Sequence, residues 1–319
     1  PLVSENNWNN FSFVTDDRHP ASLVSEGHID NNLRIAIQNG LDPITAFQIA
    51  TINTARFYNL KNIGAIVPRY WADFVIFDDI SDPRPRMVFK KGKLVAKDGK
   101  SLFNPSEAEH SHIRGTMNVA RLDDNSFKIP AKGKRIRIIE VIPGQIITKN
   151  TIDDAKIENG YAIADPERDI AKFVVVERHR ASGNIGKGFV RGFGIRNGAF
   201  ASSVAHDSHN LGVLGTNDRD MLLAAIRVIE LGGGLVIVSD GRVLAELPLP
   251  VAGLVSDKPL SEVKANVENL IETAKNIGCT LPDPFAAMSF LSLVPIPALR
   301  LTDKGLVDSQ NFKIVDVFE

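Results

Sequence analysis

The sequence predicts an α/β protein made of parts with different architectures. Residues 1–60 contain one short apolar run followed by two helical patterns, as expected for a βα unit. Residues 62–104 contain short β runs joined by Gly-containing turns, which predicts a small antiparallel sheet. From about residue 130, strand and helix patterns are mixed, which is typical of a layered α/β domain.

Composition excludes several classes of protein. The chain has 319 residues, 44% hydrophobic and 24% charged, which is ordinary for a globular protein of about two domains. Its net charge of −1 gives no electrostatic basis for a nucleic acid or an anionic membrane as principal partner. A single cysteine, Cys279, excludes an internal disulfide. No run approaches the roughly 20 apolar residues of a membrane span.

The amino terminus carries no signal-peptide pattern, because it has neither a basic segment nor an apolar segment. It also lacks an initiator Met, which indicates a processed or incomplete chain. We therefore expect a cytoplasmic protein.

The first 60 residues predict one strand and two helices. The strand covers residues 11–14, and a helix over 27–39 ends before Gly40 as its C′ residue. A second helix has Asp42 as N-cap and Pro43 at its first position, and runs to about Tyr58. A (βα)₈ barrel needs roughly 200–250 residues, so most of any barrel to which this strand belongs is absent.

The remaining elements follow from β-type runs and helical periodicity. Residues 104–128 are polar and predict a connector with one short helix. Asp240-Gly241 predicts a hairpin turn. In the second half we expect strands at 135–141, 145–148, 161–164, 171–177, 188–195, 199–205, 212–214, 235–239 and 242–246, and helices at 217–231, 260–277 and 283–293.

Asp16 and Asp17 follow the predicted strand 11–14 directly. The carboxyl end of a barrel strand is where catalytic groups are placed. A carboxylate there suits binding a metal or taking a proton from an activated water. The alternative is an acidic turn without chemistry. His19 either positions substrate or caps the loop before Pro20, and Arg18 is a candidate partner for the acids.

Two long stretches resemble one family. Thr15–Pro20 and Glu26–Asp30 resemble the last barrel strand and following loop of bacterial adenine deaminases, in the amidohydrolase superfamily. The second half resembles the carboxy-terminal domain of the same enzymes. The similar segments there are 177–179, 183–186, 188–190, 202–210, 215–218, 232–234 and 247–254.

The resemblance implies four regions. They are the last strand and helices of an amidohydrolase barrel (1–60), part of a flanking small β-sandwich (61–104), a linker (105–129), and an adenine deaminase-type α/β domain (130–319). It also implies metal-dependent hydrolysis of adenine to hypoxanthine and ammonia, in purine salvage. The cofactor expected by resemblance is a binuclear Mn²⁺ or Fe²⁺ centre, most of whose ligands are absent from this chain. The family also implies a homo-oligomer, or a complementing amino-terminal half.

By the same resemblance, Asp16 and Asp17 are the expected catalytic carboxylates, and Asp16 also contacts the metal. The expected substrate-binding residues are Arg18, His19, His206, Asp207 and His209, with Glu26, His28 and His179 as further candidates. For the histidines of the second half, a polar network within the domain remains the alternative. His110 and His112 have His-x-His spacing, but they lie in the polar linker and are not expected to bind metal. Gly183–Gly188 lacks the context of a phosphate-binding loop.

Two alternative functions remain open. The chain could be a non-catalytic module that binds a purine or assembles with another chain, or an amidohydrolase that acts on a different cyclic amidine. The isolated chain is expected to be nearly inactive and to bind metal weakly, because one carboxylate does not hold a first-row metal tightly.

Overall fold

The computed structural model describes residues 2–104 and 111–319. The chain divides into two compact units, Pro1–Ala108 (unit 1) and Glu109–Glu319 (unit 2). His110, half of the His-x-His pair in the predicted linker, lies outside the described residues. Within the described ranges, no helix combines the length and the hydrophobicity that a membrane span requires.

Unit 1 contains the two predicted helices. Helix α2 (Ile29–Gln38) ends before Gly40, which has the positive φ of +93° that favours glycine. The Asp42 carboxylate accepts the Thr45 N–H at 2.8 Å, and Pro43 begins the next helix. The end of α2 and the start of the helix at Pro43 therefore form as the local sequence predicts.

The helix expected to run from Pro43 to about Tyr58 consists of three segments. They are α3 (Pro43–Gln48), the π-helical segment η2 (Ile49–Asn53) and α4 (Thr54–Phe57). The buried Asn53 amide donates to the carbonyls of Trp8 at 2.9 Å and Phe11 at 3.0 Å. The π-helical segment therefore binds the extended amino-terminal segment, which includes η1 (Trp8–Asn10).

Residues 11–14 do not form the predicted strand. Phe11 has extended backbone angles, but the segment belongs to no strand of unit 1. An apolar alternating run forms a strand only when another strand accepts its backbone hydrogen bonds, and the described residues supply none to this segment.

The predicted small sheet of unit 1 is present and antiparallel throughout. Its order is β1-β2-β3-β4, and Lys91-Gly92 forms the turn between β2 and β3. The strands are β1 (Phe74–Phe77), β2 (Pro85–Lys90), β3 (Lys93–Lys97) and β4 (Lys100–Ser101).

Unit 2 is built on one eight-stranded sheet of order β15-β14-β12-β13-β10-β11-β6-β7. Its one parallel pair is β11 with β6; the other pairs are antiparallel. The strands are β6 (Arg135–Val141), β7 (Thr148–Asp154), β10 (Ile170–Val176), β11 (Ile185–Arg191), β12 (Ala199–Ser202), β13 (Leu211–Gly215), β14 (Gly234–Ser239) and β15 (Arg242–Pro248).

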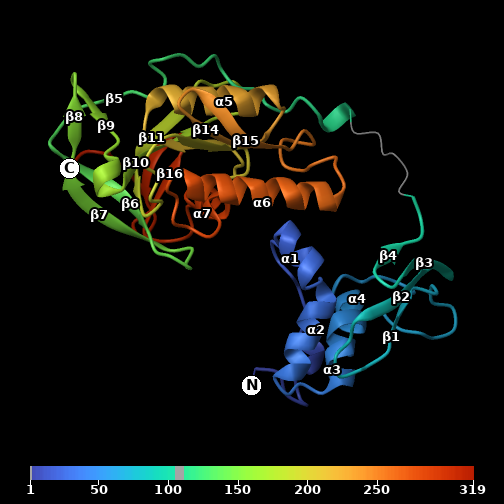
Figure 1. The fold of residues 1–319 in the computed structure, drawn as a ribbon. Coiled ribbons are helices and arrows are strands. Elements are labelled where there is room, and N and C mark those ends of the chain that lie inside the picture. Colours follow the sequence, from blue (N-terminus) through green and yellow to red (C-terminus); the bar gives the residue numbers. More distant parts are fainter. Residues whose placement is uncertain (1, 105–110) are drawn as a thin grey trace. The chain divides into compact units, whose positions relative to one another are not determined.

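Helices cover both faces of this sheet, as Figure 1 shows for α5 and α6. A hydrophobic cluster packs on each face of the sheet, and strand β10 is buried along its whole length between them. Phe173 and Val175 belong to one cluster, and Val174 and Val176 belong to the other. One cluster includes α5 (Asp218–Glu230), and the opposite cluster includes α6 (Leu260–Asn276), α7 (Pro284–Phe290), β16 (Leu299–Thr302) and β17 (Gly305–Asp308). This confirms the mixed, layered α/β class.

Several elements differ from the predictions. The predicted strand at 145–148 lies at 148–154 as β7, where pairing with β6 sets its position. The predicted helix at 283–293 ends at Phe290. Small elements that had no prediction include η1, α1 (Pro20–Ser25), β5 (Ile129–Pro130), β8 (Lys156–Glu158), η4 (Pro166–Arg168), β16, β17 and β18 (Lys313–Val315). The predicted connector contains η3 (Ser111–Ile113), and β9 (Tyr161–Ile163) lies within the predicted 161–164 run.

Candidate functional site

Asp16 and Asp17 lie at the surface of unit 1, in the turn that leads through Arg18 and His19 into helix α1 (Pro20–Ser25). Asp16 adopts a left-handed conformation with φ of 53°, and its Oδ1 accepts the Asp17 N–H at 2.9 Å. Both carboxylates are exposed. They follow an extended segment and not the end of a strand, so the predicted barrel-strand position of Asp16 is not observed within unit 1.

Arg18 and His19 anchor this turn to α1. Arg18 Nη2 lies 2.6 Å from the Glu26 carboxylate and donates to the Ser22 carbonyl at 3.3 Å. His19 Nδ1 accepts the Ala21 N–H at 3.2 Å, so His19 is the N-cap of α1. The structure thus contains the capping contact that was one of the two alternatives for His19. Substrate binding by Arg18 and His19 stays a prediction.

His28 connects the turn to the start of α2. Its Nε2 lies 3.1 Å from the Thr15 hydroxyl, next to Asp16. The His28 N–H donates to Asp30 Oδ1 at 2.7 Å, and Asp30 pairs with the buried Arg34 at 2.7 Å. The start of α2 therefore holds the segment that carries Asp16.

In unit 2, the loop between β12 and β13 brings three of the predicted residues together. The rings of His206 and His209 lie 5.5 Å apart, and Asp207 Oδ1 lies 4.0 Å from His206 Nδ1. His179, which follows β10, joins them through a 2.7 Å contact between its Nε2 and the Ser208 carbonyl. These four residues form a histidine cluster: His179, His206, Asp207 and His209.

Packing against α7 positions His206, and burial determines the protonation of His209. The His206 ring packs against Phe290 of α7 at 4.9 Å, and the His206 N–H donates to the Ser289 carbonyl at 3.0 Å. Burial lowers the pKa of His209, and the nearby His206 and Arg178 lower it further. His209 is therefore neutral at pH 7, and its Nδ1 accepts the Ala205 N–H at 3.3 Å.

Glu177 supports the base of this cluster, although it was not a predicted site residue. Its carboxylate accepts the N–H groups of His179 at 2.5 Å, Arg180 at 2.9 Å and Ser182 at 3.0 Å. Burial raises the pKa of Glu177, but these hydrogen bonds and the Ser182 hydroxyl outweigh burial and lower it to about 2.

Arg178 is a second residue that the site prediction missed. Its side chain is buried, its Nε donates to the His209 carbonyl, and its Nη2 donates to the Ala252 carbonyl at 3.3 Å. Asn210 accepts the Arg178 N–H at 3.3 Å and donates to Asp303 at 3.2 Å. Charged residues directly after the apolar run at 173–176 were the available sequence signal for Glu177 and Arg178.

The described residues do not by themselves fit a manganese or iron centre. Among residues 2–104 and 111–319, no group of three or more His, Cys, Asp or Glu side chains is placed to hold a metal ion. Asp16 contributes one exposed carboxylate. Burial raises the pKa of the Cys279 thiol to about 11, so it is not a thiolate ligand at neutral pH.

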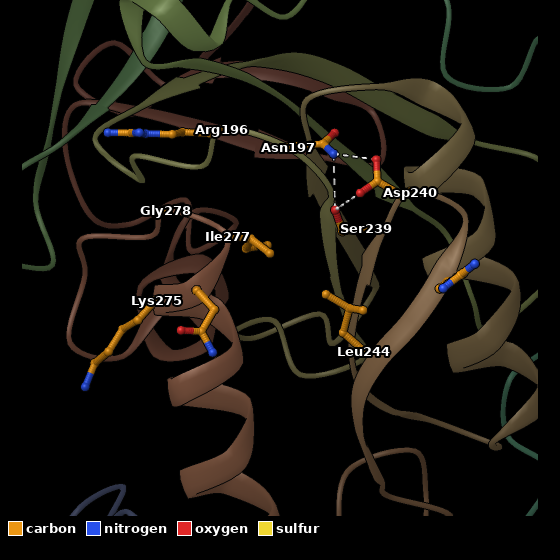
Figure 2. Close-up of a pocket in the computed structure, with 10 residues that line it drawn as sticks. Arg196, Asn197, Ser239, Asp240, Leu244, Lys275, Ile277 and Gly278 are labelled. Atoms are coloured by element: carbon orange, nitrogen blue, oxygen red, sulfur yellow. Dashed lines mark hydrogen bonds between the residues drawn. The ribbon is translucent and has the colours of Figure 1, made fainter.

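A cleft of about 800 Å³ in unit 2 lies apart from the predicted residues. Figure 2 shows Asn197 hydrogen-bonded to Asp240 at 2.7 Å and to Ser239 at 3.3 Å. Arg196 and Lys275 extend away from this group in the same view. In this view, neither labelled cation approaches the Asp240 carboxylate.

A larger apolar pocket of about 1000 Å³ belongs to unit 1. Its walls come from α2, α3, η2, α4, β1 and β2, and Phe47, Phe74 and Phe77 are among its lining residues. His28 also lines it, which places one predicted residue beside a cavity. The other lining residues are mostly aliphatic, so this pocket offers binding volume but few catalytic groups.

Fold and site together define a class: an α/β protein with exposed carboxylates in one unit and a histidine cluster on an extensive sheet in the other. Residues 145–313 match the adenine deaminase C-terminal domain family, and residues 3–95 match the amidohydrolase family. The chain therefore belongs to the adenine deaminase C-terminal domain family.

Curated relatives match this chain along almost its whole length. Adenine deaminase 2 of Carboxydothermus hydrogenoformans is 45% identical over 318 residues, which is 99% of this chain and 56% of the relative. An adenine deaminase of Kosmotoga olearia is 44% identical over 319 residues, which is 100% of this chain and 55% of the relative. The chain thus spans about half the length of the curated relatives it matches.

Proposed function

We propose that this chain is part of a metal-dependent adenine deaminase, which converts adenine and water into hypoxanthine and ammonia. The observation that carries the proposal is the 44–45% identity to curated adenine deaminases along almost the whole chain. Purine salvage in the cytoplasm is the corresponding proposed setting.

Asp16 is the proposed proton-handling group, with Asp17 beside it. Deamination needs a water to lose a proton as it attacks C6 of the purine, and the leaving amino group to gain one. A carboxylate at the reacting water performs such transfers. The exposure of Asp16 supports this role, because water and substrate can reach its carboxylate.

Metal dependence is proposed for the assembled enzyme, with Mn²⁺ or Fe²⁺ as the candidate ions and Asp16 as one ligand. The described residues supply too few ligands for such a centre, so we assign no chemical step to the metal. The further ligands, the complete barrel and the second layer of the β-sandwich are proposed to come from a region outside this chain, with a homo-oligomer as the proposed assembly.

The histidine cluster is the proposed substrate-contacting surface of unit 2. Because its Nδ1 accepts the Ala205 N–H, a neutral His209 carries its proton on Nε2 and can donate a hydrogen bond to a purine nitrogen. His206 and Phe290 present ring faces. Arg178 and Glu177 hold the loop backbone in place. Arg18 and His19 are the proposed substrate contacts of unit 1.

Complementation tests the proposal directly. Ammonia release from adenine is measured for the chain alone and for the chain joined to the part of the Carboxydothermus hydrogenoformans relative that it does not cover, each with Mn²⁺ or Fe²⁺. We expect turnover from the joined protein and almost none from the chain alone.

Three results would contradict the proposal. Robust turnover by the chain alone would show that unit 1 and unit 2 hold a complete site. A joined protein that binds adenine but releases no ammonia would favour the purine-binding module, and release from another cyclic amidine but not adenine would favour a different amidohydrolase.

A further inference from the structure

Arg300 on β16 is buried completely, with 0% of its surface exposed. Its Nε donates to the Ile296 carbonyl at 2.7 Å, and its Nη2 donates to the carbonyls of Ile146 at 2.7 Å and Pro297 at 2.9 Å. Among the described residues, its Nη1 has no hydrogen-bond partner.

No carboxylate neutralises this guanidinium within the described ranges, where its hydrogen-bond acceptors are all carbonyls. Burial lowers the pKa of Arg300 to about 10, so the side chain remains protonated at neutral pH. A buried ion without a counter-ion is energetically unfavourable, and an unpaired buried donor adds to this penalty. An anion that reached Nη1 would offset both penalties.

Arg300 also lines a cavity of about 210 Å³. The rest of the lining is mostly apolar and comes from the loop between β6 and β7 and from the region of α7. A dry apolar cavity of about 150 Å³ is large enough to bind benzene, so this volume accepts a small ring or a short aliphatic chain. Ile142, Ile146, Ile147, Leu281, Ala286, Ala287, Phe290 and Leu291 form its apolar walls.

We propose that this cavity binds a small organic carboxylate, with the carboxylate on Arg300 Nη1 and the apolar body between the β6–β7 loop and α7. A guanidinium recognises a carboxylate through parallel N–H donors, which suits this ligand better than a spherical anion. Because Arg300 is fully covered, the ligand displaces side chains of the β6–β7 loop, where Ile146 is 52% exposed.

Other polar groups of the lining fit this orientation. Asp283 is the only acid among the lining residues, and its Oδ1 accepts the Ala286 N–H at 2.9 Å as the N-cap of α7. The Thr148 hydroxyl donates to the Leu299 carbonyl at 3.0 Å. Gln145 is the remaining polar lining residue. The anionic end of the ligand therefore has one cationic partner, Arg300.

Calorimetric titration of the full chain with benzoate tests the site, and benzamide is the uncharged probe of the same shape. We expect one saturable benzoate site per chain, with affinity at least ten-fold above that for benzamide. Arg300→Gln should weaken benzoate binding at least ten-fold, whereas Arg242→Gln, which removes an exposed arginine of unit 2, should leave it unchanged.

A second variant keeps the test valid if Arg300→Gln fails to fold. Ala286→Phe fills the cavity from the exposed side of α7 and keeps the guanidinium, so it should also abolish benzoate binding while circular dichroism stays native. Equal affinity for benzoate and benzamide, no benzoate binding at 20 mM (about 100-fold above a moderate Kd), or equal competition by inorganic phosphate would each overturn the proposal. This binding readout needs no turnover, so it is independent of the proposed deaminase activity.

Discussion

Asp16 is the residue on which the proposed chemistry depends. In the joined enzyme, Asp16→Asn keeps the shape of the side chain but removes its ability to take a proton. We expect kcat for adenine to fall at least about 100-fold, the lower range for loss of a general base. The rate of ammonia release measures this fall in kcat, and Glu5→Gln, at an exposed position of the same unit, is the control. Unchanged turnover in Asp16→Asn would remove Asp16 from the mechanism.

Glu177 is expected to stabilise unit 2 in a pH-dependent way. Its pKa is lowered from 4.5 to about 2 on folding, so its contribution is fully present above about pH 4.5 and is lost as the pH falls towards 2. Glu177→Gln should reduce the free energy of unfolding by about 1–3 kcal/mol at pH 7, because the amide replaces a charged acceptor of several N–H groups.

Urea unfolding at pH 7 and pH 3 measures the effect of Glu177→Gln. The difference in free energy of unfolding between Glu177→Gln and the unmodified chain should be smaller at pH 3. At that pH the Glu177 carboxylate is largely protonated in the unfolded chain, so its contribution to stability is smaller. Glu167→Gln, at an exposed position, is the matched control. An equal loss of stability at both pH values would mean that packing, and not the charge of Glu177, is what the substitution removes.

At the scale of elements, β11 packs against β16 and β17 through two glycines. A Cβ on Gly186 would lie 1.7 Å from the Thr302 carbonyl oxygen, whereas a Cβ on Gly188 would meet Leu301 at an ordinary 3.6 Å. The two positions lie on the same face of β11, because strand side chains alternate with period 2. Close approach of backbone therefore requires glycine at 186 and not at 188.

Gly186→Ala should therefore lower the free energy of unfolding by at least about 2 kcal/mol, since the obstructing atom is backbone and cannot rotate away. Gly188→Ala should lower the free energy of unfolding by less than about 1 kcal/mol. Chemical denaturation of both variants measures the difference. Equal costs would mean that β16 moves away from β11 without penalty.

At the scale of the whole molecule, the two units differ in how much apolar surface they bury. The hydrophobic clusters of the described residues all lie in unit 2, where α5 and α6 cover opposite faces of one sheet. In unit 1 the large apolar residues Phe57 and Ile66 are 77% and 82% exposed. Burial of apolar surface is the main favourable term in folding, so unit 2 should be the more stable unit.

We therefore expect residues 111–319 to fold alone and to unfold in one cooperative transition. Calorimetry of the full chain should show that transition at nearly the same temperature, preceded by a weaker one from unit 1. Calorimetry of both proteins measures this. Failure of 111–319 to fold would mean that unit 2 depends on contacts with residues before it.

Much of unit 2 was predictable because its signals are local. Runs of β-type apolar residues predicted β6, β10 and β14, and period-3.6 patterning with flanking glycines predicted α5 and α6. Asp42 and Pro43 predicted the start of α3 in unit 1, since a cap involves atoms three residues apart. The residues of the histidine cluster were also named from the sequence, as strand-end groups expected to meet.

Elements that depend on distant partners were not predictable in the same way. Residues 11–14 have a strand pattern but no strand to pair with in unit 1, and β7 lies where β6 pairs with it. The burial of Arg178 and Arg300 likewise comes from segments far along the chain. The sequence by itself determined the α/β class, most of the elements and the family resemblance, because periodicity and motifs are local. Only the tertiary structure decided which strands pair and which charges are buried, because these depend on free energies of contact between residues far apart in the chain.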